Sequence, residues 1–317
     1  MTQMDRSRTG STSAPATRPE PPGGSFALAG RTVARIGFGA MQLPGPGVWG
    51  PPRDRDTALA VLRQAVDLGV NHIDTAQFYG AGVANELIKA ALHPYPGNLV
   101  LVSKVGAERT DDGGWRPAQR PADLRAAVEA NLRTLGVDQV DVVNLRLVDE
   151  LPSDAEIPAE QQVDLDSQLA EMASLRDEGK IGAIGLSNAT LGQLRQALPT
   201  GLACVQNSYN LLDRSGEPLL GLCREHDVAW VPYFPLGSAF PGMAKVTEHP
   251  AVMAAATELD ATPAQVGLAW LLAHDPGILL IPGTSSPAHL DENVAAAGVR
   301  LSPATIAELD GLAAAAA

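Results

Sequence analysis

The stretch VNHIDTAQFYG, residues 70–80, decides the fold, because it predicts a buried strand that runs straight into a loop bearing ionisable groups. The stretch follows Gly69 and ends at Gly80. Its first residues fit a short strand, and the rest fit a loop. Asp74 stands where the strand becomes a loop, and Tyr79 follows five residues later. The carboxylic acid of Asp74 and the phenol of Tyr79 therefore both lie close to the end of the same strand.

A second apolar run, NLVLVSK from Asn98, also ends on a charged residue, Lys104. Each ionisable residue alone has an ordinary explanation, with Asp74 as a helix cap, Tyr79 in the core and Lys104 as a solvated strand end. Functional residues of α/β barrels collect at the carboxyl ends of strands, where the loops ring a common mouth. The three residues together therefore predict a site.

Strand and helix patterns alternate along the chain. Hydrophobic runs begin near eight positions, at Ala34, Asn71, Asn98, Val140, Ile181, Leu202, Val228 and Gly277. Amphipathic windows predict helices at residues 56–69, 84–93, 121–136, 166–179, 191–198, 217–226, 262–274, 287–297 and 303–312. We place Asp56 as the cap of the first helix and Gly136 at the left-handed end of the third.

Eight strands separated mostly by helices predict an α/β fold, a (β/α)8 TIM barrel formed by residues 26–312 as one domain. Residues 25–39 hold two short apolar runs around Gly30, which predict an N-terminal β-hairpin closing the barrel floor. An open doubly wound sheet is the alternative, but no GxGxxG follows the first strand to bind a pyrophosphate.

The composition limits the partners. The chain has 317 residues and a formal net charge of −13, which disfavours nucleic acid because phosphate binding needs a clustered basic surface. No apolar run approaches the roughly 18 residues of a membrane-spanning helix, so we predict no membrane association. Cys204 and Cys223 lie in apolar segments and predict buried thiols, with a disulfide the less favoured alternative. We therefore predict a cytoplasmic protein, and we assign no metal site.

The two ends of the chain are predicted to lie outside the barrel. Residues 1–25 are rich in Ser, Thr, Pro and Gly and cannot bury enough apolar surface to order the chain, so we predict a disordered tail. They lack the apolar core of a secretory signal. Residues 313–317 are all alanine and predict a frayed end.

The loop after the first strand is a candidate ligand contact. Gly39 lets the backbone pass close to a neighbour, either packing or a ligand, and Met41 follows it. PGPGVWGPP, residues 44–52, is a loop by its Pro and Gly content. Trp49 in this loop is either a surface anchor or a wall of the substrate pocket, and we predict the wall.

DTAQFYG and the strand ending in SK resemble the aldo/keto reductase family, and the resemblance runs from residue 30 to residue 312. Further matching segments follow in the family's order: GAIGLSN at 182–188, VQNSYN at 205–210, PYFPLGS at 232–238 and IPGTSSPAHLDEN at 281–293. The resemblance implies a barrel that reduces carbonyl groups with a nicotinamide cofactor, through a tetrad of Asp, Tyr, Lys and His.

The resemblance implies that Tyr79 donates the proton, with Lys104 as the adjacent ammonium and Asp74 as its partner. An adjacent ammonium favours phenolate, so we expect the pKa of Tyr79 to come down toward neutral. The fourth position departs from the family, because VDVVNLR, residues 140–146, places Arg146 where VDLxxxH has histidine. The NLR string resembles a bacterial branch that includes pyridoxal reductases.

Arg146 is a candidate for both catalysis and substrate binding. A guanidinium can orient a carbonyl oxygen and clamp a neighbouring anionic oxygen, but it cannot shuttle a proton. The alternative is a structural ion pair with Asp149 or Glu150.

The cofactor residues are also implied by the resemblance. Gly39 and Met41 would lie beside the nicotinamide ribose, Tyr233 would stack on the ring, and Ser187, Asn188 and Gln206 would bind its carboxamide. Leu236 and Ser238 match pyrophosphate contacts, and Glu292 and Asn293 match adenine contacts. Many members that prefer NADPH carry Lys at Gly283 and Arg at His289, whereas this chain offers Thr284, Ser285 and His289. Hydroxyls and a helix start can still hold a 2′-phosphate, so NADPH is favoured and NADH use is open.

The sequence therefore predicts an NADPH-dependent reductase of a small aldehyde or ketone, with pyridoxal-like aldehydes among the expected substrates. The competing hypothesis is a regulatory subunit that binds the nucleotide without catalysis, since fold does not fix function. The complete set of Asp74, Tyr79 and Lys104 favours the enzyme. The sequence leaves the oligomeric state open.

Overall fold

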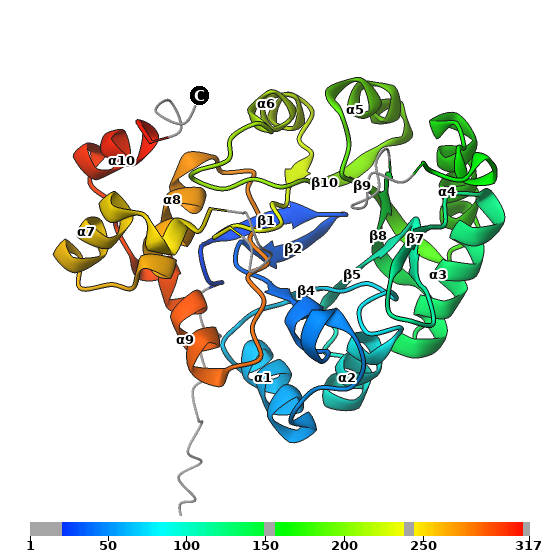
Figure 1. Cartoon of the computed structure of the whole chain (residues 1–317), viewed down its shortest axis with the longest axis horizontal. Helices are drawn as coiled ribbons and strands as arrows, with labels where there is room; N and C mark the ends of the chain where they lie inside the picture. Colours follow the sequence, from blue (N-terminus) through cyan, green and yellow to red (C-terminus); the bar gives the residue numbers. More distant parts are fainter. Residues whose placement is uncertain (1–20, 149–155, 238–243, 313–317) are drawn as a thin grey trace, which may run out of the picture.

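The computed structural model describes residues 21–148, 156–237 and 244–312. Parallel strands form a central barrel, and helices ring its outside (Figure 1). The main sheet has the order β11-β10-β9-β8-β5-β4-β3. Its strands are β3 (Phe38–Gly39), β4 (His72–Asp74), β5 (Val100–Val105), β8 (Val140–Arg146), β9 (Ile181–Ser187), β10 (Leu202–Gln206) and β11 (Ala229–Trp230).

The segment 277–281 closes the barrel between the two edges of this sheet. Leu280 N donates to Arg35 O at 2.8 Å, and Leu279 N donates to Trp230 O at 2.8 Å. The bridges that it makes on both sides are parallel. The predicted eight-stranded barrel is therefore confirmed, with its last strand present as isolated bridges.

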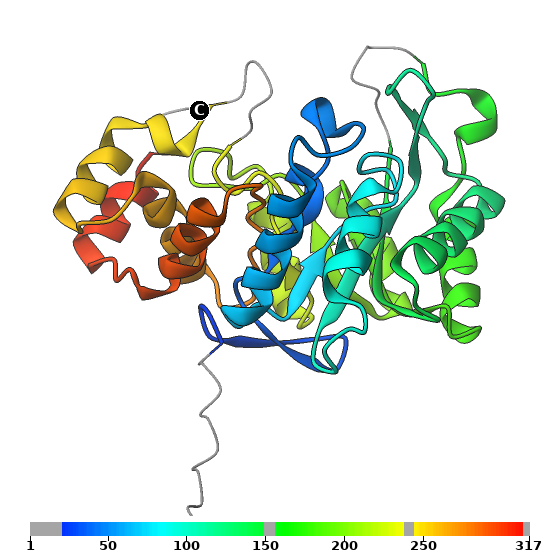
Figure 2. The ribbon, with the colours of Figure 1, turned by 90° about the horizontal axis from the view of Figure 1, so that it is seen from below.

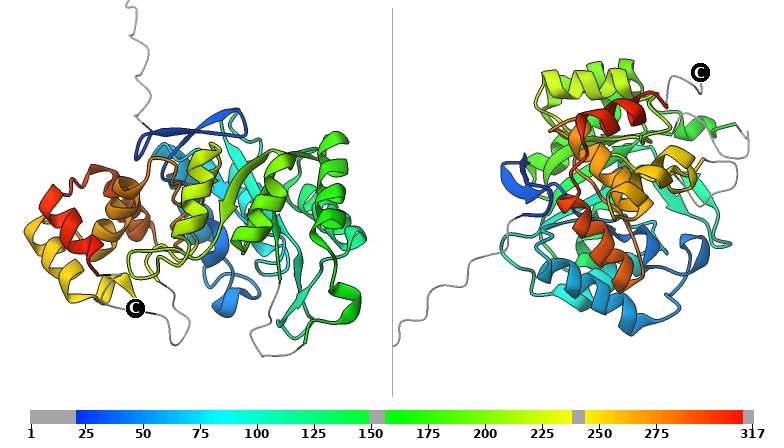
Figure 3. Two further views of the ribbon diagram at one scale, coloured as in Figure 1. Left: turned by 90° about the horizontal axis from the view of Figure 1, so that it is seen from above. Right: turned by 90° about the vertical axis from the view of Figure 1, so that its left-hand side faces the viewer.

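Helices follow the strands around the barrel. They are α1 (Arg55–Asp67), α2 (Val83–Leu92), α3 (Pro121–Leu135), α4 (Leu165–Asp177), α5 (Leu191–Ala197), α6 (Glu217–Glu225), α7 (Pro250–Glu258), α8 (Pro263–His274), α9 (Pro287–Ala295) and α10 (Pro303–Asp310). Helices α7 and α10 pack together at one side of the barrel (Figure 3). Among the described residues, no helix is long and apolar enough to cross a membrane.

The predicted helices agree with these to within a few residues, with one wrong cap and two missed elements. Asp54 rather than Asp56 caps α1, because the Asp54 carboxylate accepts from Asp56 N at 3.0 Å and Thr57 N at 3.1 Å. Gly136 ends α3 with φ 70°, as predicted. Helix α7 and the antiparallel hairpin of β6 (Ala107–Arg109) and β7 (Trp115–Pro117) were not predicted.

The N-terminal hairpin closes the floor of the barrel, as predicted. Strands β1 (Ser25–Leu28) and β2 (Arg31–Ala34) pair antiparallel and lie across the end of the barrel where the strands begin (Figure 2). Leu28 and Val33 are buried and pack against the lower layer of the barrel interior. This layer comprises Val100, Val102, Val142, Cys204, Ala229, Val231, Leu279 and Ile281.

The predicted disordered tail extends five residues too far, since the described residues begin at 21 and Ser25 already starts β1. Residues 21–24 are ordered in a turn, in which Gly24 N donates to Pro21 O and Pro22 O accepts from Ile36 N, each at 3.0 Å. Residues 1–20 and 313–317, the rest of the predicted tails, lie outside the described residues. Cys204 and Cys223 are buried free thiols, as predicted.

The charged and polar residues of the predicted site lie at the end of the barrel opposite the hairpin. Asp74, Arg146, Ser187 and Gln206 are the last residues of their strands, and Lys104 is the last but one of β5. Because all these strands are parallel, their carboxyl ends meet at one mouth.

We predict that Leu28→Ala lowers the free energy of unfolding by about 2–5 kcal/mol, because it leaves a cavity between the hairpin and the barrel interior. Thr32→Ala on the exposed side of the same hairpin is the control and should change stability by less than about 0.5 kcal/mol. Urea denaturation measures both, and equal effects of the two substitutions would show that the hairpin does not seal the core.

Candidate active site

A buried ion pair stands at the centre of the mouth. Lys104 Nζ donates to Asp74 Oδ1 and also to the carbonyl oxygen of Thr75 at 3.0 Å. Gln206 Nε2 donates to Asp74 Oδ2 at 2.7 Å, so both carboxylate oxygens have partners. Burial lowers the pKa of Lys104, but Asp74 and Tyr79 raise it by more, and the net shift is upward. The ammonium therefore stays charged although Lys104 is only 4 % exposed.

The Tyr79 phenol lies beside this ammonium, with Lys104 Nζ 5.1 Å from the ring centroid. Burial raises the pKa of Tyr79, and this outweighs the opposing effect of Lys104, while Asp74 adds to the rise. The expectation that the pKa of Tyr79 comes down toward neutral is therefore wrong for this structure. The phenol remains protonated at neutral pH, which is the form that a proton donor needs.

Arg146 is half-buried at the end of β8 and faces the same site. Its positive charge opposes the rise in the pKa of Tyr79 and that of Tyr233, both of which burial raises. In the part of the chain that the structure describes, the guanidinium has no hydrogen-bond or ion-pair partner. Asp149 and Glu150, its predicted structural partners, lie outside the described residues.

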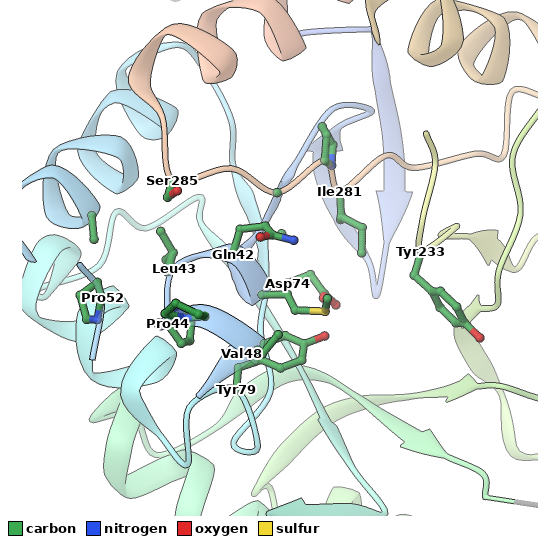
Figure 4. Close-up of a pocket in the computed structure, with 18 of the residues that line it drawn as sticks. Gln42, Leu43, Pro44, Val48, Pro52, Asp74, Tyr79, Tyr233, Ile281 and Ser285 are labelled. Carbon is green, nitrogen blue, oxygen red and sulfur yellow. The ribbon is translucent and has the colours of Figure 1, made fainter. Parts of the chain in front are cut away.

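A cavity of about 640 Å³ opens next to these residues. Figure 4 shows Asp74 and Tyr79 near its centre, with Tyr233 to one side and Pro52 and Ser285 to the other. Nine of the predicted site residues line it: Gly39, Met41, Asp74, Tyr79, Tyr233, Leu236, Gly283, Ser285 and Asn293. The lining includes Asp74 and Tyr79 at one place and Ser285 and Asn293, just before and within α9, at another.

One wall of this cavity consists of residues that were not predicted as part of the site. Gln42, Pro44, Val48, Arg53 and Thr57 also line it, and they belong to the loop after β3 and the start of α1. The Pro- and Gly-rich composition of this loop was the available signal, since such loops at barrel mouths shape binding sites.

Trp49, in the same loop, does not line the cavity, so the prediction that it forms a pocket wall is wrong. Its side chain is 36 % exposed and lies against the turn of the β6–β7 hairpin, near Gly113. Arg109 lies beneath it and donates to Gly47 O at 3.1 Å and Val48 O at 2.8 Å. Trp49 is therefore a surface anchor, which was the other interpretation.

Two side-chain atoms of the predicted cofactor site have no hydrogen-bond partner among the described residues. They are Ser187 Oγ and Gln206 Oε1, and both are buried. Because the Gln206 amide nitrogen donates to Asp74, its oxygen is left as an acceptor. A hydroxyl that can donate and an amide oxygen that can accept are what a carboxamide requires, so these residues fit a nicotinamide group.

The third member of the predicted carboxamide set is already engaged. Asn188 Nδ2 donates to Leu147 O at 3.1 Å, and Asn188 Oδ1 accepts from the Tyr233 hydroxyl at 3.3 Å. Asn188 adopts a left-handed conformation with φ 60°, which asparagine tolerates better than most residues. In this structure it orients Tyr233 rather than offering a free amide.

Gly39 and the segment that follows the last strand are in close backbone contact. A Cβ on Gly283 would lie 2.6 Å from Gly39 O, and a Cβ on Gly39 would lie 2.5 Å from Ile281 O. Both positions therefore exclude a side chain unless the backbone shifts. Gly283 has no room for the basic residue that many members of the family carry there.

The remaining predicted cofactor residues surround the start of α9. Ser286 caps this helix through His289 N at 3.4 Å, and Thr284 Oγ1 accepts from Ser286 N at 3.0 Å. Thr284, His289 and Glu292 are not among the residues that line the cavity. His289 is exposed, and Ser238 lies outside the described residues.

Comparison with known proteins places this architecture in a family. Residues 35–314 match the aldo/keto reductase family. Pyridoxine 4-dehydrogenase of Escherichia coli is 46% identical over 289 residues, which cover 91% of this chain and 98% of that protein. An uncharacterised oxidoreductase of Schizosaccharomyces pombe is 36% identical and covers 90% of this chain and 89% of that protein.

A solved structure agrees with these relatives. The aldo/keto reductase of Klebsiella pneumoniae in complex with NADP and acetate has a TM-score of 0.74 and 29% identity, covering 91% of this chain and 94% of that one. A family match over residues 35–314, a relative at 46% identity and a shared barrel lead to one conclusion: this chain belongs to the aldo/keto reductase family and is an oxidoreductase.

Proposed function

We propose that this protein reduces a small aldehyde or ketone with NADPH and that Tyr79 is the proton donor. The observation that carries the proposal is the buried cluster of Asp74, Lys104 and Tyr79 beside a cavity that is also lined by residues next to and within α9. The Klebsiella pneumoniae reductase binds NADP, and the two orphaned polar atoms at Ser187 and Gln206 suit a carboxamide.

NADPH, when bound, supplies the hydride that the carbonyl carbon accepts. Ser187 and Gln206 would hold the carboxamide, and Tyr233 would cover one face of the ring. Tyr79, protonated at neutral pH, donates its proton as the carbonyl oxygen gains negative charge. Lys104 then stabilises the phenolate that remains, and Asp74 keeps Lys104 charged and oriented.

Arg146 suggests which carbonyl compounds bind best. An aldehyde with an acidic oxygen next to the carbonyl, as in pyridoxal, offers two acceptors to a planar fork of donors. The Escherichia coli relative, a pyridoxine 4-dehydrogenase, supports a substrate of this kind. We therefore propose an ortho-hydroxy aromatic aldehyde as the preferred class. A spectrophotometric screen of NADPH oxidation over a panel of aldehydes and ketones tests the function, and binding of NADPH without turnover would refute it.

We predict that Tyr79→Phe abolishes carbonyl reduction and leaves the affinity for NADPH almost unchanged, because the phenol acts on the substrate oxygen. Tyr95→Phe is the control, because Tyr95 donates to Leu135 O at 2.6 Å far from the mouth. Steady-state turnover and NADPH binding by fluorescence measure the two effects. Retention of more than about a tenth of wild-type turnover, a loss under roughly 1.4 kcal/mol, would contradict the acid assignment.

We predict that Arg146→His loses more activity on pyridoxal-like aldehydes than on benzaldehyde, by about 1.5–3 kcal/mol in transition-state stabilisation. Histidine removes the fixed charge and the second donor. The measurement is kcat/KM for both substrates in the wild type, in this variant and in Arg146→Lys, which keeps the charge without the fork. Equal losses on both substrates would leave Arg146 without a role in selecting anionic ones.

We predict that His289→Arg raises the preference for NADPH over NADH, because it adds a positive charge at the exposed first turn of α9, where the 2′-phosphate is expected. His289→Gln, which adds no charge, should leave the ratio unchanged. The ratio of kcat/KM for the two cofactors is measured at low and high salt, since attraction between exposed charges fades with ionic strength. No change at low salt would place the adenosine end elsewhere.

A further inference from the structure

A network of buried polar side chains lies behind the strand ends that carry Asp74 and Lys104. We call it the polar bridge, and it consists of Thr75, Gln77, Asn85, Ser103, Asn131 and Thr134. Its members come from the ends of β4 and β5 and from α2 and α3, which pack side by side outside these strands (Figure 1). Four of them are completely buried: Thr75, Asn85, Ser103 and Asn131 are 0% exposed.

Asn85 is the centre of the polar bridge. Its oxygen accepts from the Thr75 hydroxyl at 2.8 Å, and its Nδ2 donates to Asn131 Oδ1 at 2.9 Å. Nδ2 also lies 3.0 Å from both Gln77 Oε1 and Thr134 Oγ1. An amide nitrogen has two hydrogens, so its donor capacity is fully used.

Asn131 connects the second strand to the same centre. Its oxygen accepts from the Ser103 hydroxyl at 2.6 Å, and its nitrogen donates to Ala127 O, one turn earlier in α3, at 2.9 Å. The polar bridge therefore ties the ends of β4 and β5 to a fixed point on α3.

The polar bridge is connected to the proposed catalytic residues by the backbone, because its members are their neighbours in sequence. Thr75 follows Asp74, Ser103 precedes Lys104, and successive side chains of a strand point to opposite faces. Lys104 therefore faces the barrel mouth while Ser103 faces the helices. The Thr75 carbonyl oxygen accepts from Lys104 Nζ at 3.0 Å, which couples the hydroxyl on one side to the ammonium on the other.

Stability alone gives no reason for a polar bridge in this place. The neighbouring contacts of α2 and α3 use apolar residues such as Ile88 and Val128, and apolar residues of the same shape are nearly neutral in stability against a satisfied hydrogen-bonded pair. Hydrogen bonds add direction, however, because a slip of one strand would leave buried polar groups without partners, which is unfavourable.

We propose that Asn85 and Asn131 are positioning residues, which act through Thr75 and Ser103 to hold Asp74 and Lys104 in the geometry for proton transfer from Tyr79. The proposal rests on the proposed function of these three residues. A misplacement of about 1 Å can lower a rate about 100-fold, so a network that fixes two strand ends has a direct effect on turnover.

The test compares Thr75→Val, which replaces the hydroxyl by a methyl group of similar size, with Thr75→Ser, which keeps the hydroxyl. We expect kcat to fall about 10-fold or more in Thr75→Val and to stay within about threefold in Thr75→Ser, with the affinity for NADPH unchanged in both. Turnover is expressed per NADPH-binding site, so a fraction of unfolded protein does not lower it.

Asn85→Ala is compared with Asn71→Ala, because Asn85 in α2 anchors the residue after β4 whereas Asn71 anchors the start of that strand. Asn71 stands just before β4, where its side chain accepts from Ala34 N at 2.7 Å and donates to Thr32 O at 2.9 Å, at the floor of the barrel. Both changes should lower the thermal midpoint, but only Asn85→Ala should lower kcat, by about 10- to 100-fold.

If Asn85→Ala does not fold, the Thr75 pair decides. Equal kcat in Thr75→Val and Thr75→Ser, or a loss in Asn85→Ala no greater than in Asn71→Ala, would overturn the positioning role while the proposed function stands. A wild-type protein that turns over no carbonyl compound would overturn both.

Discussion

The ion pair of Asp74 and Lys104 is the interaction on which the site depends. Two charges at 2 % and 4 % exposure have lost most of their hydration, and their mutual attraction offsets this only with good geometry and further hydrogen bonds. The Asp74 carboxylate receives its second bond from Gln206, and the Lys104 ammonium receives its second acceptor from the Thr75 carbonyl. The pair is therefore stable only because three strands deliver their ends to one point.

This requirement explains why the surrounding residues serve more than one purpose. The side-chain nitrogen of Gln206 donates a hydrogen bond to the Asp74 carboxylate. Its side-chain oxygen is thereby left to accept from the carboxamide that we propose. Thr75 satisfies Lys104 with its carbonyl and connects to the helices with its hydroxyl. Burial keeps the phenol of Tyr79 protonated, so the exclusion of water that strengthens the ion pair also keeps the proposed acid in its protonated form.

The order of strands and the residues at their ends could be predicted from the sequence, because short apolar runs that end in Asp74, Lys104 and Arg146 carry a local signal. Properties that depend on the folded surroundings of a residue could not be predicted in this way. The pKa of Tyr79 is the balance of burial against Lys104, and burial is not visible in the sequence. Trp49 was misplaced because its neighbour is the β6–β7 hairpin, whose strands of three residues each have too little periodicity to detect. The cap of α1 was shifted by two residues, since Asp54 and Asp56 both precede the helical pattern.

The backbone contact at Gly39 and Gly283 joins segments from opposite ends of the chain. Barrel closure therefore depends on a contact between residues that are far apart in the sequence. We expect this contact to form late in folding, because the entropy cost of closing so long a loop precedes the stabilisation that the contact brings. Strands β3 to β10 can pair in the order in which they leave the ribosome, but the seam needs segment 277–281. A nascent chain that stops short of this segment lacks the last strand, so the barrel can close only after residues 277–281 have been made.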